Sequence, residues 1–318
     1  MNAPLPIDDG VGPSSQWLPA GNWKTVLEFL IDHYPGVPNE TWILRMAKGG
    51  VVDETGQQLD PESRYRAGAC IFYYRELENE TPIPFSESIV YQDEHLLVAD
   101  KPHFLPVVPA GRFLRETLLV RLRSQGQPDS LAPVHRLDRE TAGLVLFSRN
   151  PETRGDYTAL FRERKVKKVY EALARTPRKS QGLDYPLTRK SRIVPGEPFF
   201  RMQEVSGRAN AESVIELIAT DDDLAQFRLR PLTGKKHQLR VHLAALGFPI
   251  VNDRLYPDNA FVPHSNRADD FAKPLKLLAR SVTFTDPVTG EERFFESERR
   301  LSIADCRFED EGNGSDSD

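Results

Sequence analysis

The chain has 318 residues, 39% of them hydrophobic, which is enough to bury a core in one large and one small domain. No apolar stretch approaches the roughly 18 residues that a membrane-spanning helix needs, and the acidic, proline-rich N-terminus does not resemble a signal peptide. The two cysteines have neither metal-binding nor disulfide spacing, so we expect a reduced, cytoplasmic protein without a membrane partner.

The net charge of −5 is unevenly distributed along the chain. Residues 1–100 hold 6 Lys and Arg against 16 Asp and Glu, and residues 309–318 add five acids and no base. Residues 101–308 therefore carry 36 basic and 26 acidic side chains, with the highest density of Lys and Arg between Arg162 and Arg192. A region of this kind attracts phosphate, so the distribution favours contact with nucleic acid over an ordinary solvated surface.

Residues 21–78 predict a small α/β module. Apolar side chains recur at helical spacing over residues 25–34, and a second short helix is expected over residues 41–47. Glycines then predict turns that lead into strands starting at Val51 and Cys70.

Three segments beside this module have compositions that do not predict regular structure. Residues 1–20 are rich in Pro, Gly, Ser and Asp, and we expect them to lack fixed structure. Residues 79–87 contain two prolines and predict a linker to a second domain over residues 88–308. The acidic tail, residues 309–318, is expected to be disordered.

The second domain begins near Ser88 and contains many short apolar runs. The runs at residues 89–91 and 96–99 predict strands around a turn. The best helix candidates are residues 118–123, 154–164 and 236–246, the last with apolar side chains at helical spacing. Many short strands with few helices predict an α+β fold with a mainly antiparallel mixed sheet.

The segment His135-Arg-Leu-Asp-Arg-Glu-Thr-Ala-Gly-Leu144 places one carboxylate, Asp138, between two arginines. A carboxylate among cations is held ionised, and an ionised Asp in a fixed position can act as a nucleophile. A structural ion pair in a loop would show the same residues. The residues alone therefore leave both roles open.

This segment resembles the catalytic motif of the RluA-type pseudouridine synthases. The resemblance implies that Asp138 is the nucleophile that rearranges uridine in RNA. It also implies that residues 88–308 form the α+β catalytic domain of that family. The order helix, helix, turn, strand in residues 21–78 is similar to the small S4-like module that often precedes this domain.

Two further segments resemble motifs of the same family, in the same order. Lys168-Val-Tyr-Glu-Ala172 resembles the strand that supplies the active-site tyrosine, which implies that Tyr170 stacks on the base and transfers a proton. Leu232-Thr-Gly-Lys-Lys-His-Gln-Leu-Arg-Val-His-Leu243 resembles the family's Thr-Gly-Arg-x-His-Gln-Ile-Arg-x-His block. It implies that Arg240 pairs with the catalytic carboxylate.

The resemblance also implies contacts with substrate or RNA outside the three catalytic positions. Arg136 corresponds to the position that fills the space left by a flipped base, and Arg139 would hold phosphate or brace the loop. Lys101-Pro-His-Phe104 resembles a Lys-Pro-x-Gly block, with Phe104 in place of the glycine. The complete set of implied contacts is His135, Arg136, Arg139, Lys101, Lys235 and Leu277, the last as an apolar wall of the uracil pocket.

Pseudouridine formation breaks the bond between ribose and uracil N1 and joins C5 to the same sugar carbon. Nothing is consumed, so we expect no cofactor and no metal. The expected substrates are uridines in 23S rRNA, in tRNA or in both, and the expected state is a monomer. Two alternatives remain: a non-catalytic RNA-binding or ribosome-assembly protein on the same fold, and a hydrolytic N-glycosidase.

Overall fold

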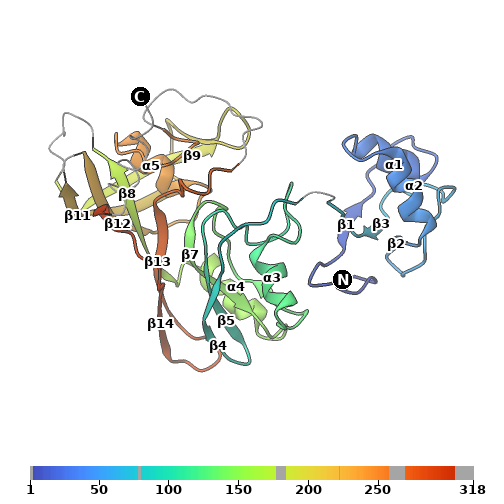
Figure 1. The fold of residues 1–318 in the computed structure, drawn as a ribbon, viewed down its shortest axis with the longest axis horizontal. Helices are drawn as coiled ribbons and strands as arrows, with labels where there is room; N and C mark the ends of the chain where they lie inside the picture. Colours follow the sequence, from blue (N-terminus) through green and yellow to red (C-terminus); the bar gives the residue numbers. More distant parts are fainter. Residues whose placement is uncertain (1–2, 78–79, 177–183, 222, 258–268, 305–318) are drawn as a thin grey trace, which may run out of the picture. The chain divides into compact units, whose positions relative to one another are not determined.

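The computed structural model describes residues 3–77, 80–176, 184–221, 223–257 and 269–304 (Figure 1). The expected acidic tail lies outside these residues. The chain divides into two compact units, one made of Met1–Thr81 with Val108–Asp129 and the other of Pro82–Val107 with Ser130–Asp318.

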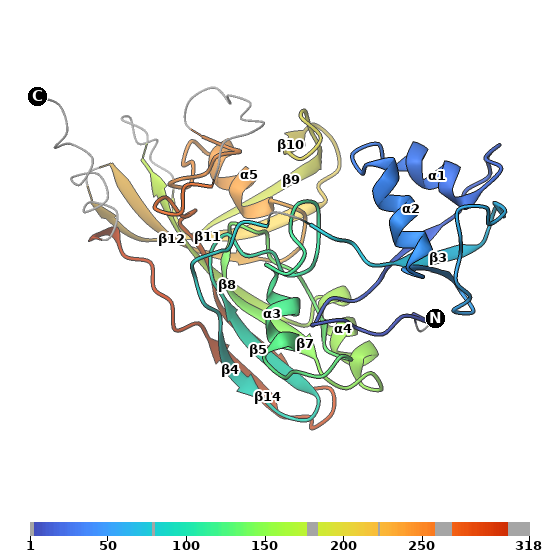
Figure 2. The ribbon, with the colours of Figure 1, turned by 45° about the vertical axis from the view of Figure 1, so that its right-hand side comes forward.

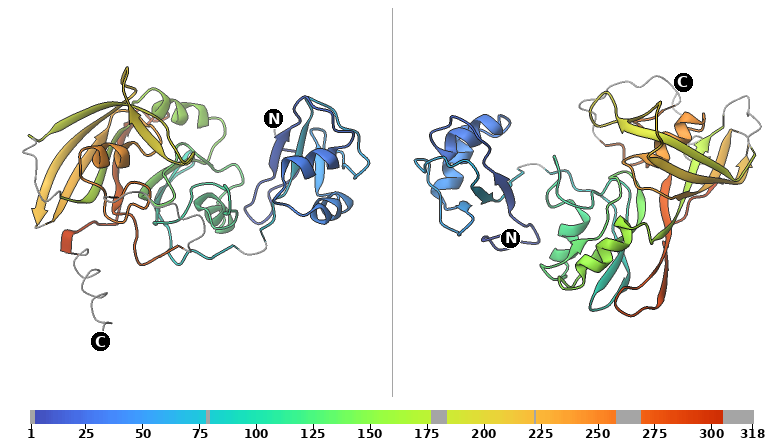
Figure 3. Two further views of the ribbon diagram at one scale, coloured as in Figure 1. Left: turned by 90° about the horizontal axis from the view of Figure 1, so that it is seen from above. Right: turned by 180° about the vertical axis from the view of Figure 1, so that it is seen from behind.

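The first unit contains a three-stranded antiparallel sheet in the order β1-β3-β2. Helices α1 and α2 pack against this sheet (Figure 3), with Phe29 and Trp42 at the centre of the shared core. Thr25 begins α1 because its side-chain oxygen accepts a hydrogen bond from the backbone N–H of Glu28. The elements of this unit are β1 (Ser14–Trp17), α1 (Val26–His33), α2 (Asn39–Ala47), β2 (Val51–Asp53), β3 (Cys70–Tyr73) and α3 (Leu118–Ser124).

Strand β1 differs from the expectation that residues 1–20 lack fixed structure. Ser14 to Trp17 pair with Tyr73 to Cys70 of β3 in antiparallel register. The polar composition of the segment gave no sign of this strand, because its backbone hydrogen bonds are made to residues more than 50 positions away.

The second unit is built around one large mixed sheet, in the order β10-β9-β11-β12-β8-β13-β7-β5-β4 (Figures 1 and 2). Among the described strands, only β13 and β7 pair in parallel. This architecture confirms the predicted α+β class. Its elements are β4 (Ser88–Gln92), β5 (Leu96–Lys101), β6 (Ala132–Pro133), β7 (Ala142–Ser148), α4 (Arg154–Arg162), β8 (Lys167–Arg175), β9 (Leu187–Pro195), β10 (Met202–Val205), β11 (Ala211–Asp221), β12 (Leu224–Pro231), α5 (Gln238–Ala245), β13 (Leu277–Thr285) and β14 (Glu292–Glu296).

Strand β7 follows the Asp138 segment and is buried along its whole length, as the apolar run predicted. Its parallel contact with β13 depends on Gly143, which has a φ of +111°. A Cβ at this position would lie 2.2 Å from the carbonyl oxygen of Ala279. Only glycine therefore lets the two backbones approach this closely.

Helix α5 begins two residues later than predicted. His237 has a left-handed φ of 56°, and the helix starts at Gln238. The Gln238 side chain accepts hydrogen bonds from the Thr233 hydroxyl (2.6 Å) and the Lys235 backbone N–H (3.1 Å), which ties the preceding turn to the helix. Leu239 and Leu243 then pack into the core beneath the sheet.

None of the helices in the described part of the chain is both long and apolar enough to cross a membrane.

Candidate active site around Asp138

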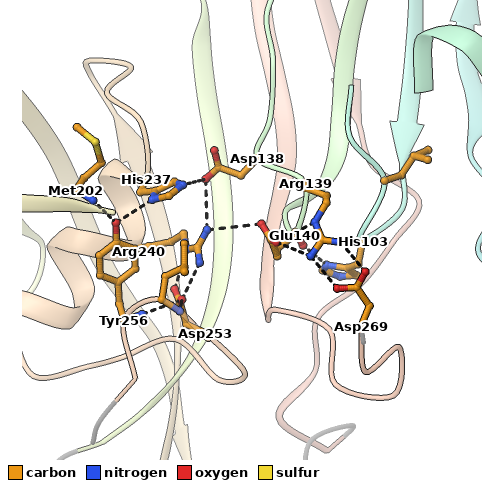
Figure 4. Close-up of polar contacts among 12 residues, drawn as sticks. His103, Asp138, Arg139, Glu140, Met202, His237, Arg240, Asp253, Tyr256 and Asp269 are labelled. Atoms are coloured by element: carbon orange, nitrogen blue, oxygen red, sulfur yellow. Dashed lines mark hydrogen bonds and ion pairs between the residues drawn. The ribbon is translucent and has the colours of Figure 1, made fainter. Parts of the chain in front are cut away.

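Asp138 lies in the loop that enters β7, where its carbonyl oxygen accepts a hydrogen bond from the Thr141 backbone N–H (3.1 Å). Its side chain is 28% exposed, so the carboxylate can reach a ligand from solvent. Two nitrogens from the α5 region face the same carboxylate oxygen (Figure 4): Arg240 Nη1 lies 3.7 Å and His237 Nε2 lies 3.8 Å from Asp138 Oδ2. Both distances are too long for a hydrogen bond, and at this separation the Arg240 cation attracts the carboxylate electrostatically.

Arg240 is almost completely buried and makes its main pair with Asp253, not with Asp138. Its Nε and Nη2 donate to the two oxygens of Asp253 at 2.8 and 2.7 Å. The third nitrogen, Nη1, has no hydrogen-bond partner among the described residues and lies between Asp138 and Glu140, at 3.7 and 3.9 Å (Figure 4). Burial alone would lower the pKa of Arg240, but Asp253, Asp138 and Glu140 outweigh it and raise the pKa.

Nothing in the sequence pointed to Asp253. It follows a short apolar run, Pro249-Ile-Val251, and no charge pattern or motif distinguishes it from a loop residue. In the structure, its carboxylate also accepts the backbone N–H groups of Leu255 (2.9 Å) and Tyr256 (3.1 Å). This fully satisfied carboxylate fixes the guanidinium and directs the unpaired nitrogen toward Asp138.

Tyr170 lies on β8 and is partly buried in the core cluster that also contains Leu277. The register of β8 and β13 pairs Leu277 with Ala172, two residues from Tyr170, so both side chains lie on one face of the sheet. Burial raises the pKa of Tyr170, and the charge of Asp138 raises it further. The phenol therefore stays protonated at neutral pH beside an apolar wall.

Lys101 is completely buried, although the sequence suggested a contact with substrate or RNA. Its ammonium donates to the carbonyl oxygens of Pro102 (2.9 Å), Leu105 (2.7 Å) and Arg139 (3.1 Å). Burial lowers the pKa of Lys101 to about 7, while Glu140 and Asp138 oppose this shift. The three hydrogen bonds tie the loop after β5 to the loop that carries Asp138.

Phe104, which replaces the glycine of the family block, has a left-handed φ of 65°. Its ring is 2% exposed and packs against Phe85 and Phe271, with ring centroids 6.0 and 5.2 Å away. The Arg139 guanidinium lies 6.0 Å from this ring and is held by both oxygens of Asp269, at 2.8 and 3.0 Å. These contacts make Arg139 a brace for the Asp138 loop.

The remaining residues predicted from the sequence are one partly buried histidine and two exposed cations. His135 stacks on Phe161, with ring centroids 4.3 Å apart, and its Nε2 accepts the Leu146 backbone N–H (3.1 Å). Burial lowers the pKa of His135 to about 3, with a further contribution from the charge of Lys168, so the ring is neutral. Arg136 and Lys235 are exposed.

Together, these residues present a partly exposed carboxylate, a fixed guanidinium and a protonated phenol beside an apolar wall. Such a set can place a carboxylate against a planar, polar ring and support proton transfer. Within the described ranges, no group of three or more His, Cys, Asp or Glu side chains is arranged to hold a metal ion.

Comparison with known proteins identifies relatives of this domain. The family model described as RNA pseudouridylate synthase matches residues 95–245. The chain is 30% identical over 236 residues to the uncharacterized RNA pseudouridine synthase slr1592 of Synechocystis sp., covering 73% of this chain and 79% of the relative. It is 36% identical over 211 residues to the dual-specificity RNA pseudouridine synthase RluA of Salmonella typhimurium, covering 65% of this chain and 90% of the relative.

The solved structure of human RNA pseudouridylate synthase domain containing 4 is also similar. It has a TM-score of 0.50 and 27% identity, and the match covers 68% of this chain and 89% of the human chain. The sequence motifs, the large mixed sheet and these relatives agree. The chain therefore belongs to the RluA-type RNA pseudouridine synthases, a family of isomerases that act on RNA.

Proposed function

We propose that this protein converts specific uridines in structured RNA to pseudouridine, with Asp138 as the nucleophile. The observation that carries the proposal is the position of Asp138, partly exposed and 3.7 Å from a buried guanidinium nitrogen that has no hydrogen-bond partner among the residues that the structure describes. Arg240 can therefore stabilise and orient the carboxylate without withdrawing it from the substrate.

The reaction conserves atoms. The bond between ribose C1′ and uracil N1 breaks, C1′ bonds to C5, a proton leaves C5, and N1 gains a proton. Addition of Asp138 to the ring, attack on the sugar carbon, and assistance of an elimination all need the same charged and oriented carboxylate. In this scheme Tyr170 stacks on the base and exchanges a proton, and Leu277 contributes to the apolar wall of the pocket.

The RNA must present the uridine outside a base stack, which costs about a few kcal/mol. Arg136 is exposed and lies two residues before Asp138, so its flat cation is placed to occupy the space of the flipped base and stack on its neighbours. Lys235 is exposed in the turn before α5 and would contact phosphate.

The RluA relative of Salmonella typhimurium is named as dual-specificity, so we propose that this chain also accepts more than one RNA. Large-subunit 23S rRNA and tRNA are the two classes to test, by mapping pseudouridines in both from a deletion strain. We further propose that the protein acts in the cytoplasm as a monomer.

The nucleophile is tested by tritium release from RNA labelled at C5 of uridine. The wild-type protein should release tritium, and Asp138→Asn should release none while still binding the RNA. Near-normal release by Asp138→Asn would overturn the proposal. A non-catalytic RNA-binding protein would release no tritium in any form, and an N-glycosidase would yield free uracil and an abasic site.

A further inference from the structure

His237 occupies a constrained position immediately before α5. Its backbone is left-handed, and its side chain is only 7% exposed. The two ring nitrogens face different partners (Figure 4): Nδ1 lies 2.8 Å from the Tyr256 hydroxyl, and Nε2 lies 3.8 Å from Asp138 Oδ2. Which nitrogen carries the proton therefore decides whether His237 can donate to Asp138.

The hydrogen bonds of Tyr256 decide which ring nitrogen of His237 carries the proton. Its hydroxyl oxygen accepts the backbone N–H of Met202, at the start of β10, over 2.8 Å. The hydroxyl hydrogen then needs an acceptor, and among the described residues the remaining partner of this oxygen is His237 Nδ1. Burial raises the pKa of Tyr256, so the hydroxyl keeps its hydrogen at neutral pH. A ring that accepts at Nδ1 carries its proton at Nε2.

We propose that Tyr256 fixes His237 as the Nε2–H tautomer, and that His237 is a positioning residue which donates to Asp138 in the complex with RNA. This inference rests on the proposed role of Asp138 as nucleophile. Active-site hydrogen bonds are often long in the free enzyme and shorten when the substrate binds, which is consistent with the separation of 3.8 Å.

The geometry also distinguishes the two oxygens of the carboxylate. Both His237 Nε2 and Arg240 Nη1 face Oδ2 of Asp138. Once His237 donates to Oδ2 in the complex with RNA, Oδ1 is the oxygen presented to the nucleotide. Fixing one oxygen and leaving the other to react restricts rotation of the carboxylate, which lowers the entropic cost of reaching the reactive geometry.

The ring must be neutral for its tautomer to matter. The charged groups that face it are Asp138, Arg240, Lys236 and Asp253. Burial lowers the pKa of His237, and the two cations act in the same direction as burial while the two carboxylates oppose it. His237 is therefore a neutral donor at pH 7, and it supports the carboxylate without adding a second fixed positive charge.

The tautomer can be observed directly by NMR of the full-length protein with ¹⁵N-labelled histidine. The His237 ring, assigned by its loss in His237→Gln, should show a protonated Nε2 and an unprotonated Nδ1. Tyr256→Phe keeps the ring that lies 5.4 Å from the Arg240 guanidinium and removes only the hydroxyl. It should convert the signal to a mixture of tautomers. An unchanged Nε2–H signal in Tyr256→Phe would overturn the inference.

A matched pair of variants tests the effect on the reaction. Gln and Met have the same length and are both unbranched at Cβ, but only Gln has an N–H donor near the position of Nε2. In single-turnover tritium release, His237→Gln should remain within about 10-fold of wild type and His237→Met should fall about 10- to 100-fold below His237→Gln. RNA affinity should be equal in both.

The outcomes separate this inference from the proposed function. If Asp138→Asn is inactive and His237→Met reacts as fast as His237→Gln, the positioning role is wrong and the nucleophile stands. If Asp138→Asn is active, the proposed function itself fails. If both His237 variants lose structure, seen as a large equal fall in melting temperature, the tautomer signal in Tyr256→Phe decides the question.

Discussion

Replacing Asp253 with asparagine should destabilise the protein far more than the same replacement of Asp138. The Asp253 side chain is 0% exposed and forms two short hydrogen bonds with Arg240, whose side chain is 1% exposed. Removing one partner of a buried ion pair costs about 3–5 kcal/mol. Because the amide oxygen of Asn keeps one acceptor, we expect a loss of unfolding free energy near the lower end of this range, about 3 kcal/mol. This loss lowers the ratio of folded to unfolded protein by more than about 100-fold.

Asp138 is 28% exposed and 3.7 Å from Arg240, a geometry that contributes about 0–1 kcal/mol. Asp138→Asn should therefore unfold almost as the wild type does, while its tritium release is lost. Asp253→Asn should lose stability and, through a displaced Arg240, also activity.

Urea unfolding at pH 7 measures both effects. All three tryptophans, Trp17, Trp23 and Trp42, lie in the first unit, so far-UV circular dichroism is the suitable probe for the second. Equal losses of unfolding free energy in the two variants would refute the reasoning, because they would show that Arg240 depends on Asp138 as much as on Asp253.

Three residues that support the site, Gly143, His135 and Phe104, should also contribute to stability. Gly143→Ala should lower the free energy of unfolding by more than about 3 kcal/mol or prevent folding, because the added Cβ would meet the backbone of Ala279. A normal melting temperature would contradict the close pairing of β7 and β13. The pKa of His135 in the folded protein, about 3, lies below its ordinary 6.5, so the unfolded chain binds the extra proton and the free energy of unfolding falls as pH falls from about 6.5 toward 3, by up to roughly 1.4 kcal/mol per pH unit. In urea unfolding at several pH values, His135→Gln should reduce this slope. An unchanged slope would exclude His135 as its source. Phe104→Ala removes a buried ring from a left-handed position and should lower the free energy of unfolding, measured in urea, by about 3–5 kcal/mol. A loss below about 1 kcal/mol would show that the aromatic cluster contributes little to stability.

Local patterns in the sequence predicted the elements that depend on neighbouring residues. Helices α3 and α4 begin at Leu118 and Arg154, the first residues of two of the helix candidates. The buried strand β7 also follows from a short apolar run, whereas the strand that carries Tyr170 was expected from its resemblance to a family motif.

Features made by distant segments could not be predicted in this way. The pair between Arg240 and Asp253 joins a helix to an irregular loop, and its short hydrogen bonds leave no periodic pattern. Phe104 was visible as a replaced glycine, but its left-handed backbone and its contacts with Phe85 and Phe271 exist only in the folded chain. The buried ammonium of Lys101 is a similar case, since a lysine in sequence suggests a surface charge.

The place of β13 in the sheet has a consequence for synthesis on the ribosome. This strand, Leu277–Thr285, lies between β7 and β8, which are made more than 100 residues earlier. Until it has emerged from the exit tunnel, β7 and β8 have no strand to join them, and their facing edges remain unpaired. Completion of the sheet must therefore await nearly the whole chain, and nascent chains that stop before Leu277 should be especially prone to aggregation and to capture by chaperones.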